Sequence, residues 1–378
     1  MVLFLLILAA LFLSACGTAV ASTNWPGLSA DGQRAFVAYG PQVVALDVAE
    51  EEQLWAFPAE PEQSVQYYAA PAVGEEQIIV GDYGRSGGLI SARVTVSLYA
   101  LDRSSAEAGA PSVRWISDAL AADRIIAPPL LVDGVVYIGT ADNEVFALDA
   151  ASGEPLWDQP FQAGHSIWGQ PAYADGVLYV ASLDTNLYAL DAETGRELWQ
   201  RSFDGTLASR PVVDDTLVYV GSYDESVYAV NKSDGSIAWA AELSAPVWVA
   251  PVFDGERLFV ADSDGHIEAL SAETGESQWQ ADLGLVVVAT PVVHNGRLYI
   301  ATAGDPALED EQRQGEVLAL SAEDGEELWR ESAPGPIYTP LVISGDTLVA
   351  ATTAEGALVV VYNLEDGNLE WSFAPAAP

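Results

Sequence analysis

Few side chains in this 378-residue sequence are placed to do chemistry. The three histidines, His165, His266 and His294, are scattered along the chain, and their spacing offers no metal-binding set. The sequence contains no phosphate-binding glycine loop and no nucleophile elbow. We therefore predict no catalytic residue, no cofactor and no metal site, and we expect the histidines to lie in surface loops.

Two acidic stretches supply the oxygen ligands that calcium prefers. The first is Asp262-Ser263-Asp264-Gly265, which is also typical of a hairpin turn. The second comprises Asp305, Glu309, Asp310 and Glu311. We interpret the first as a turn and the second as an acidic loop, for which weak cation binding stays open.

Four aromatic residues form the candidate binding site. Each lies two or three places before a proline that opens a predicted strand, whereas equivalent places in other repeats are aliphatic. The aromatic members are Tyr68, Trp168, Trp248 and Tyr338, and the aliphatic ones are Ile126, Ala208 and Val288. If the repeats form a ring, this place lies at the mouth of its channel. There the aromatic rings could stack on a flat ligand or grip a peptide; packing of the inner strands is the alternative.

A repeat of roughly 40 residues must position these side chains, and such a period is typical of a solenoid or a propeller. A tryptophan marks each copy, and insertions lengthen the spacing at two points. The eight structural tryptophans are Trp55, Trp115, Trp157, Trp199, Trp239, Trp279, Trp329 and Trp371.

Each copy has the pattern of short antiparallel strands. Residues 177–191, VLYVASLDTNLYALD, are rich in Val, Leu and Tyr alternating with small or polar residues. Turn sequences such as Asp175-Gly176 and Thr194-Gly195 bound the runs, and Pro171 opens a further strand. We predict four strands in each repeat, with the tryptophan on the last strand, where it joins the repeat to its neighbour.

The repeat resembles that of the pyrroloquinoline-quinone (PQQ)-like propellers. Their pattern is similar to V-Y-V-G-S-x-D-G-x-L-Y-A-L-D-A-x-T-G-x-x-L-W, and four successive copies starting at Val135, Val177, Leu217 and Arg257 are close to it. The resemblance covers residues 25–373. It implies an all-β fold, one eight-bladed β-propeller of four-stranded antiparallel blades, as a single domain over residues 23–378. How the ring closes stays open.

Some members of this family are quinone-dependent dehydrogenases. The resemblance implies that such an enzyme holds a quinone and a calcium ion and commonly carries a disulfide between adjacent cysteines. Cys16 is the only cysteine here, so no disulfide can form within the chain. We expect a protein that is not an enzyme and keep the dehydrogenase as the least favoured alternative.

The first 22 residues, MVLFLLILAALFLSACGTAVAS, have the pattern of an export signal. The string Leu13-Ser14-Ala15-Cys16-Gly17 resembles the bacterial lipoprotein box, in which the cysteine carries the lipid. We therefore predict a lipoprotein signal and anchor region over residues 1–22, with Cys16 as the attachment site; a plain cleaved signal is the alternative. No lysine or arginine precedes the apolar run, which leaves open a start upstream of Met1.

The charge of the chain excludes one class of partner. Its 55 acidic residues outnumber 14 basic ones, for a formal net charge of -41. Such a polyanion repels phosphate backbones and has no basic stripe, so we expect no nucleic-acid partner.

Insertions point to a partner-binding rim. Residues 83–97 and 303–316 are both expected between second and third strands, on the face that carries the connections between blades, and residues 103–114 form a further insertion. Tolerated surface variation is the alternative explanation.

The anchor, blade number and missing cysteine pair together resemble the BamB-like lipoproteins of this family. We expect an exported, lipid-anchored, non-enzymatic scaffold, a monomer within a larger complex. Its partners are expected to be cell-envelope proteins, with the β-barrel assembly machinery among the candidates. The alternative is a binding or sensory module for a small ligand or envelope polymer at the aromatic mouth.

Overall fold

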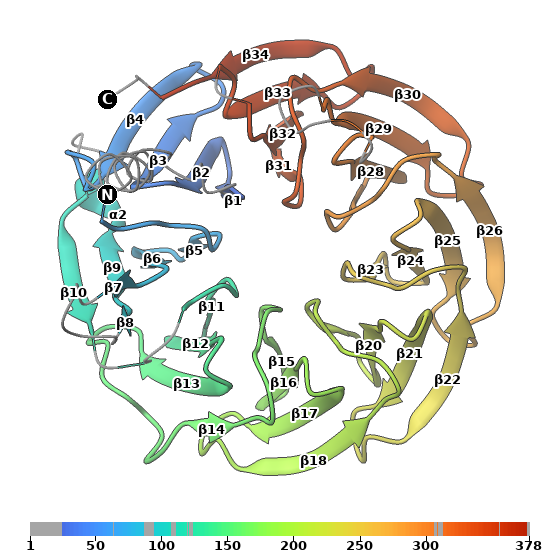
Figure 1. Cartoon of the computed structure of the whole chain (residues 1–378), viewed down its shortest axis with the longest axis horizontal. Helices are drawn as coiled ribbons and strands as arrows, with labels where there is room; N and C mark the ends of the chain where they lie inside the picture. Colours follow the sequence, from blue (N-terminus) through green and yellow to red (C-terminus); the bar gives the residue numbers. More distant parts are fainter. Residues whose placement is uncertain are drawn as a thin grey trace, which may run out of the picture.

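Eight four-stranded antiparallel sheets stand around a central opening, so the predicted eight-bladed propeller is confirmed (Figure 1). The computed structural model describes residues 25–62, 64–86, 94–106, 111–118, 120, 124–305, 308, 313–354 and 356–375. Cys16 and the predicted signal lie outside these residues. Within the described residues, no helix has the length and apolar character needed to cross a membrane.

The first four blades follow one another along the chain. Blade one has β1 (Gly27–Asp31), β2 (Arg34–Tyr39), β3 (Gln42–Asp47) and β4 (Glu52–Phe57), and blade two has β5 (Ala72–Val73), β6 (Gln77–Gly81), β9 (Leu98–Asp102) and β10 (Val113–Ser117). Blade three has β11 (Leu130–Val132), β12 (Val135–Gly139), β13 (Glu144–Asp149) and β14 (Phe161–Gln162), and blade four has β15 (Ala172–Ala174), β16 (Val177–Ala181), β17 (Asn186–Asp191) and β18 (Glu197–Ser202).

The other four blades repeat the same order. Blade five has β19 (Val212–Val213), β20 (Leu217–Gly221), β21 (Ser226–Asn231) and β22 (Ile237–Glu242), and blade six has β23 (Val252–Phe253), β24 (Arg257–Ala261), β25 (His266–Ser271) and β26 (Ser277–Asp282). Blade seven has β27 (Val292–His294), β28 (Arg297–Ala301), β29 (Glu316–Ser321) and β30 (Glu327–Ser332), and blade eight has β31 (Val342–Ser344), β32 (Thr347–Ala351), β33 (Val359–Asn363) and β34 (Leu369–Phe373).

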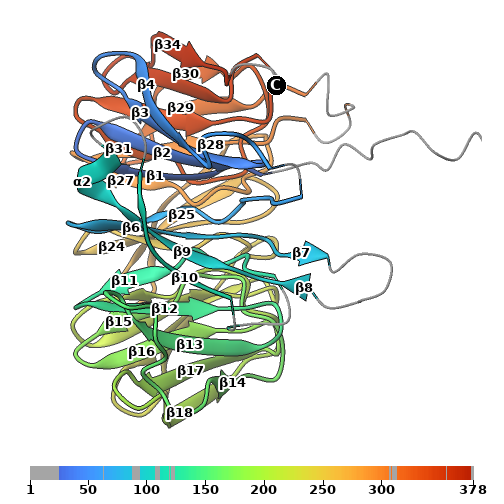
Figure 2. The same cartoon turned by 90° about the vertical axis from the view of Figure 1, so that its left-hand side faces the viewer.

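Blade two carries the additional elements. A two-stranded hairpin, β7 (Arg85–Ser86) and β8 (Val94–Thr95), lies between β6 and β9, and the one-turn helix α2 (Arg103–Ala106) follows β9. Since the strands of a blade are antiparallel, links between second and third strands share a face with the connections between blades. We call this side the connection face and the opposite side the turn face. The β7–β8 hairpin projects from the connection face (Figure 2).

The burial of each strand follows its distance from the axis of the ring. The middle strands are covered on both sides by neighbouring blades, so β16, VLYVA, is almost continuously apolar and buried. The outermost strand β18, ELWQRS, alternates between half-buried and exposed residues. The apolar residues therefore form one cluster at each interface between neighbouring blades, as for Tyr179 and Leu187 of blade four with Val218 and Val220 of blade five.

Tryptophan links each blade to the next. Trp199 Nε1 donates to the carbonyl of Lys232 at 2.9 Å, and the indole ring lies against Gly235 on the hairpin turn of blade five. In the described part of the chain, seven of the eight tryptophans make this hydrogen bond. The donors are Trp115, Trp157, Trp199, Trp239, Trp279, Trp329 and Trp371. Trp55 is buried and packs on Phe36, with ring centroids 6.0 Å apart.

Trp157 differs from the expectation that the tryptophan lies on the last strand. It falls between the isolated bridge at Pro155 and the two-residue strand β14. Pro155 and Pro160 flank it and lack the amide hydrogen that a strand requires, so the last strand of blade three is interrupted. The indole nevertheless keeps the bond to the next blade, from Nε1 to the Ala192 carbonyl at 3.1 Å.

The ring closes without strand exchange, because blades one and eight are each built from consecutive strands. Trp371 Nε1 donates to the Val48 carbonyl at 3.1 Å, and Ser344 Oγ donates to the Gly32 carbonyl at 3.0 Å. Apolar residues of β2 and β3 share a buried cluster with residues of β32 and β33. The closing seam therefore has a tryptophan bond and an apolar cluster, as other seams do.

Candidate functional site

A cavity of about 360 Å³ lies on the ring axis, walled by residues that precede or open the innermost strands of six blades. Most of the wall comes from two equivalent sequence positions in the connections between blades, which we call the first and the second place. The first place is the one singled out in the sequence, and it contributes Trp168, Ala208, Trp248 and Val288. The second place, two residues further on, contributes Pro128, Gln170, Arg210, Ala250, Thr290 and Pro340.

Trp168 and Trp248 form the aromatic part of this cavity. Their ring centroids are 6.4 Å apart and their planes are tilted by 56°. Trp248 is 39% exposed, and its other neighbour is Tyr223, with centroids 5.2 Å apart. Burial raises the pKa of Tyr223 to about 12, so its hydroxyl stays neutral at physiological pH. The two indoles thus leave an open, angled apolar surface.

Tyr68 and Tyr338 have other neighbours. Tyr338 packs on Trp25, with centroids 5.8 Å apart, and its hydroxyl accepts a hydrogen bond from Arg313 Nη1 at 3.2 Å. Tyr68 packs edge-on against Tyr83 at 4.5 Å. The structure therefore brings two of the four candidate mouth residues together in the cavity and places the other two in separate aromatic pairs.

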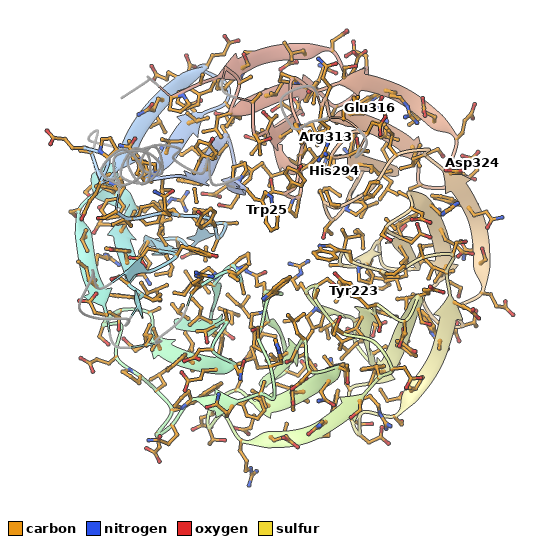
Figure 3. The ribbon with its side chains drawn as sticks, in the orientation of Figure 1. Trp25, Tyr223, His294, Arg313, Glu316 and Asp324 are labelled. Carbon is orange, nitrogen blue, oxygen red and sulfur yellow. The ribbon has the colours of Figure 1, made fainter. Side chains whose placement is uncertain are left out.

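Trp25 is a fifth aromatic residue at the same place, and the mouth residues predicted from the sequence do not include it. It lies four residues before Ser29, which pairs with Phe36, just as Trp168 lies four before Ala172, which pairs with Tyr179. Trp25 is 51% exposed and lies at the edge of the central opening, as does Tyr223 (Figure 3). Leu28, not proline, stands three residues after Trp25, so a search based on the strand-opening proline does not find Trp25.

Arg210 is the charged residue of the cavity wall. Its Nη1 donates to Gln170 Oε1 at 3.4 Å, and within the described residues no carboxylate makes an ion pair with it. Water reaches the side chain, but the protein around it lowers the pKa of the guanidinium through desolvation. An arginine remains charged despite such a shift. Arg210 was not predicted as a site residue, although alignment of the repeats carries a signal: it directly precedes Pro211, whereas Gln170 holds the same place before Pro171 without a charge.

The structure keeps the three histidines apart. His165 is exposed before β15, His266 opens β25, and His294 ends β27. Among the residues that the structure describes, no three His, Cys, Asp or Glu side chains gather as a possible metal site.

The structure describes the first acidic stretch, Asp262 to Gly265, and only Asp305 of the second. Asp262 is buried, and its Oδ1 accepts the backbone amides of Asp264 and His266 at 3.0 Å each, which supports the turn interpretation. Glu309, Asp310 and Glu311 lie outside the described residues, so cation binding there stays a prediction.

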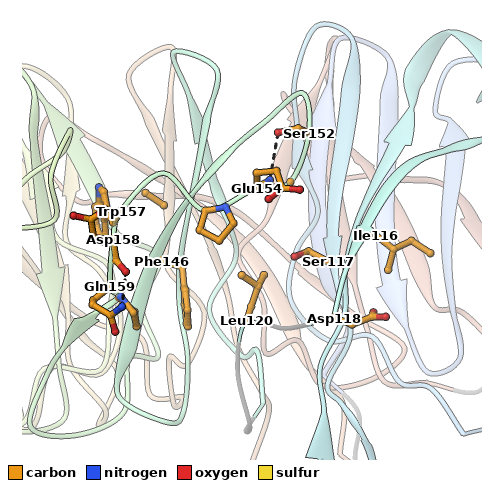
Figure 4. A pocket seen from close by; sticks show the side chains of 14 residues that line it. Ile116, Ser117, Asp118, Leu120, Phe146, Ser152, Glu154, Trp157, Asp158 and Gln159 are labelled. Atoms are coloured by element: carbon orange, nitrogen blue, oxygen red, sulfur yellow. Dashed lines mark hydrogen bonds between the residues drawn. The ribbon is translucent and has the colours of Figure 1, made fainter.

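A second hollow of about 380 Å³ lies between blades two and three (Figure 4). Ile116, which is 54% exposed, and Phe146 line it together with the proline-flanked segment around Trp157. The interrupted last strand of blade three leaves this apolar surface uncovered.

The fold and the axial cavity define the class of protein: an eight-bladed β-propeller built from PQQ-type repeats. The family model described as outer membrane protein assembly factor BamB matches residues 14–163, 99–204, 141–243, 183–305 and 284–378. The chain therefore belongs to this family.

Three solved structures with the same fold illustrate its range. BamB from Moraxella catarrhalis is 24% identical over 74% of this chain and 81% of that chain, with a TM-score of 0.58. The computationally designed Ika8 protein is 13% identical over 93% and 97%, with a TM-score of 0.69. A europium-containing methanol dehydrogenase is 14% identical over 80% and 77%, with a TM-score of 0.64. No curated protein matches the chain. At these identities the likenesses show the fold alone.

Proposed function

We propose that this protein is a non-enzymatic scaffold of the cell envelope, anchored by a lipid at Cys16, which supports the assembly of outer-membrane proteins. The observation that carries the proposal is the match of the BamB assembly-factor model to segments running from residue 14 to residue 378. A match of this extent involves every blade, so the resemblance is not limited to a few consensus repeats.

The connection face is the proposed partner-binding surface. It carries the β7–β8 hairpin, which no other blade has in the described chain, and the connections between blades. A projecting loop on a rigid ring can present side chains to a partner without disturbing the core.

The absence of enzyme activity is part of the proposal. The single cysteine rules out an intrachain disulfide, which the quinone-dependent relatives commonly have. The test is to add quinone and calcium to the purified protein and to follow dye reduction with a panel of alcohols and sugars. Substrate-dependent reduction would contradict this part of the proposal.

Affinity capture of the full-length protein from its own membranes tests the scaffold role. We expect barrel-assembly components to be recovered and the protein to fractionate with membranes, whereas Cys16→Ser should release it into the soluble fraction. Replacement of residues 85–95 by a short Gly-Ser turn should reduce recovery of the partner. Shortening of residues 104–112 is the matched control, since α2 lies on the turn face, and it should leave recovery unchanged. Failure to recover any assembly component with the intact protein would exclude the proposal.

A further inference from the structure

The environment of Arg210 differs from that of other basic side chains in this acidic protein. Several other basic groups pair with carboxylates, as with Arg103 and Asp31 or with Lys232 and Asp175, and Arg297 donates to backbone carbonyls. Arg210 lies instead in the axial cavity, where its one hydrogen bond goes to the neutral amide oxygen of Gln170. The chain offers 55 acidic residues, yet within the described part none is paired with this guanidinium.

The fold does not require a charge at this place. The register of the first two strands of each blade identifies the equivalent residues, and none of them is charged. They are Gly27, Ala70, Pro128, Gln170, Ala250, Thr290 and Pro340. Seven blades thus form the same inner edge with small or neutral residues, so Arg210 adds a charge that packing does not explain.

Gln170 is the polar neighbour of Arg210 in the cavity wall. Gln170 Nε2 donates to the Pro129 carbonyl at 2.8 Å, which fixes the amide and directs Oε1 toward the guanidinium. This contact uses one of the five N–H groups of arginine, and the cavity wall contains no carboxylate. The remaining donors are available to an anion that enters from solvent.

The apolar part of the cavity lies beside this charge. Trp168 and Trp248 line the same cavity and present tilted ring faces, with Trp248 39% exposed. An indole surface binds an apolar group by removing its area from water. The arrangement therefore joins one positive charge to one apolar surface.

We propose that the axial cavity binds a small organic monocarboxylate, whose carboxylate pairs with Arg210 and whose apolar body lies against Trp168 and Trp248. The volume of about 360 Å³ is near the lower end of small-ligand pockets, which span roughly 300–1,000 Å³. One guanidinium matches one negative charge, and the net charge of -41 disfavours a ligand with several. This site opens among the connections between blades, and binding of a small ligand there goes beyond the scaffold role proposed above.

Calorimetric titration of the full protein with two probes of equal shape tests the charge requirement. The probes are 3-phenylpropionate and its neutral amide, 3-phenylpropionamide. We expect one site for the carboxylate and at least about tenfold weaker binding of the amide, since a hydrogen bond to a charged group contributes about 1.5–3 kcal/mol. Equal affinity for the two probes, or no binding of the carboxylate at millimolar concentration, would overturn the proposal.

Variants locate the site. Arg210→Gln places at blade five the residue that blade four already uses at Gln170, so the ring should fold unchanged, and carboxylate affinity should fall to the level of the amide. Arg196→Gln removes the same charge from an exposed turn and should leave affinity within about twofold. Trp248→Ala should weaken both probes alike. An Arg210→Gln protein that retains full carboxylate affinity would refute the assignment, and because partner capture is measured separately, this result would leave the scaffold role standing.

Discussion

At the scale of single residues, six of the eight seams in the described chain place an indole against a glycine. The ring of Trp199 lies so close to Gly235 that a Cβ on the glycine would be 2.6 Å from Cε3. The same glycine has a φ of 70°, which ordinary side chains adopt only with strain. The repeated Gly and Trp are therefore one structural unit, divided between adjacent blades.

Trp199→Ala should lower the free energy of unfolding by about 3–5 kcal/mol, because it removes a large packed ring and leaves the Lys232 carbonyl without its donor. Trp168→Ala removes the same side chain from the cavity wall and should cost much less stability while weakening ligand binding. Chemical denaturation of both variants provides the measurement. Equal stability losses, with ligand and partner binding unchanged, would assign Trp168 to packing.

Gly235→Ala should destabilise the protein by about 2–4 kcal/mol, the sum of strain at positive φ and the clash with Trp199. The matched control is Gly176→Ala, since Gly176 has a φ of 79° but no atom within 4 Å of the place that the alanine methyl would occupy. Only the strain, about 1–2 kcal/mol, should appear there. Identical losses in thermal melts would show that the contact with the indole contributes nothing.

At the scale of elements, aspartates order the hairpin turns. Asp191 Oδ1 accepts the Thr194 amide at 2.8 Å and the Thr194 hydroxyl at 2.6 Å, and these bonds hold the pKa of Asp191 below its usual range. Asp102 does the same before α2, where hydrogen bonds from Ser104, Ser105 and Arg114 lower its pKa to about 2. The acidic residues of the turns therefore have a structural role as well as a solubilising one.

Acid should remove the contribution of Asp102. Its pKa in the folded protein is lower than the ordinary value of 3.8, so its stabilising effect is complete above pH 3.8 and is lost as the pH falls toward about 2. Asp102→Asn cannot titrate at this site. The difference in unfolding free energy between wild type and Asp102→Asn should therefore shrink across this window, and a constant difference would contradict the assignment.

The strands were predictable because alternation and turn residues are local properties. Residues 177–191 specify β16 and β17 directly, and repetition confirms the pattern blade by blade. The position of Trp157 outside a strand was harder to predict. Its repeat spacing predicts a last strand at this point, whereas Pro155 and Pro160 interrupt that strand in the structure. The β7–β8 hairpin lies in an insertion without repeat partners, so only its location between strands could be inferred.

The candidate site was predictable in part for a related reason. The aromatic place was identified from its offset to proline, which selected Trp168 and Trp248 but missed Trp25. No blade has an aromatic residue at the place of Arg210, so the search for aromatic side chains did not reach it. Its proposed role in binding rests on its hydrogen bond to Gln170 and on the lack of a paired carboxylate in the described residues. Such features depend on the distance between blades, which a single repeat does not encode.

At the scale of the whole molecule, the net charge of -41 opposes compaction. We predict that sodium chloride raises the melting temperature, because the screening length falls from about 10 Å at 0.1 M to about 3 Å at 1 M. A neutral solute at matched osmolality is the control. A melting temperature that stays constant or falls with salt would show that the surface charges are already well compensated.

The seam between blades eight and one has a consequence for the order of the chain. Because it is joined by side chains and a tryptophan bond, as elsewhere, rather than by a shared sheet, no blade boundary is privileged in the folded ring. A circular permutant should therefore fold, with residue 373 linked to residue 25 by a segment like that from Ser202 to Val212 and new termini between blades three and four. The order of the blades around the ring therefore does not depend on which blade comes first in the chain.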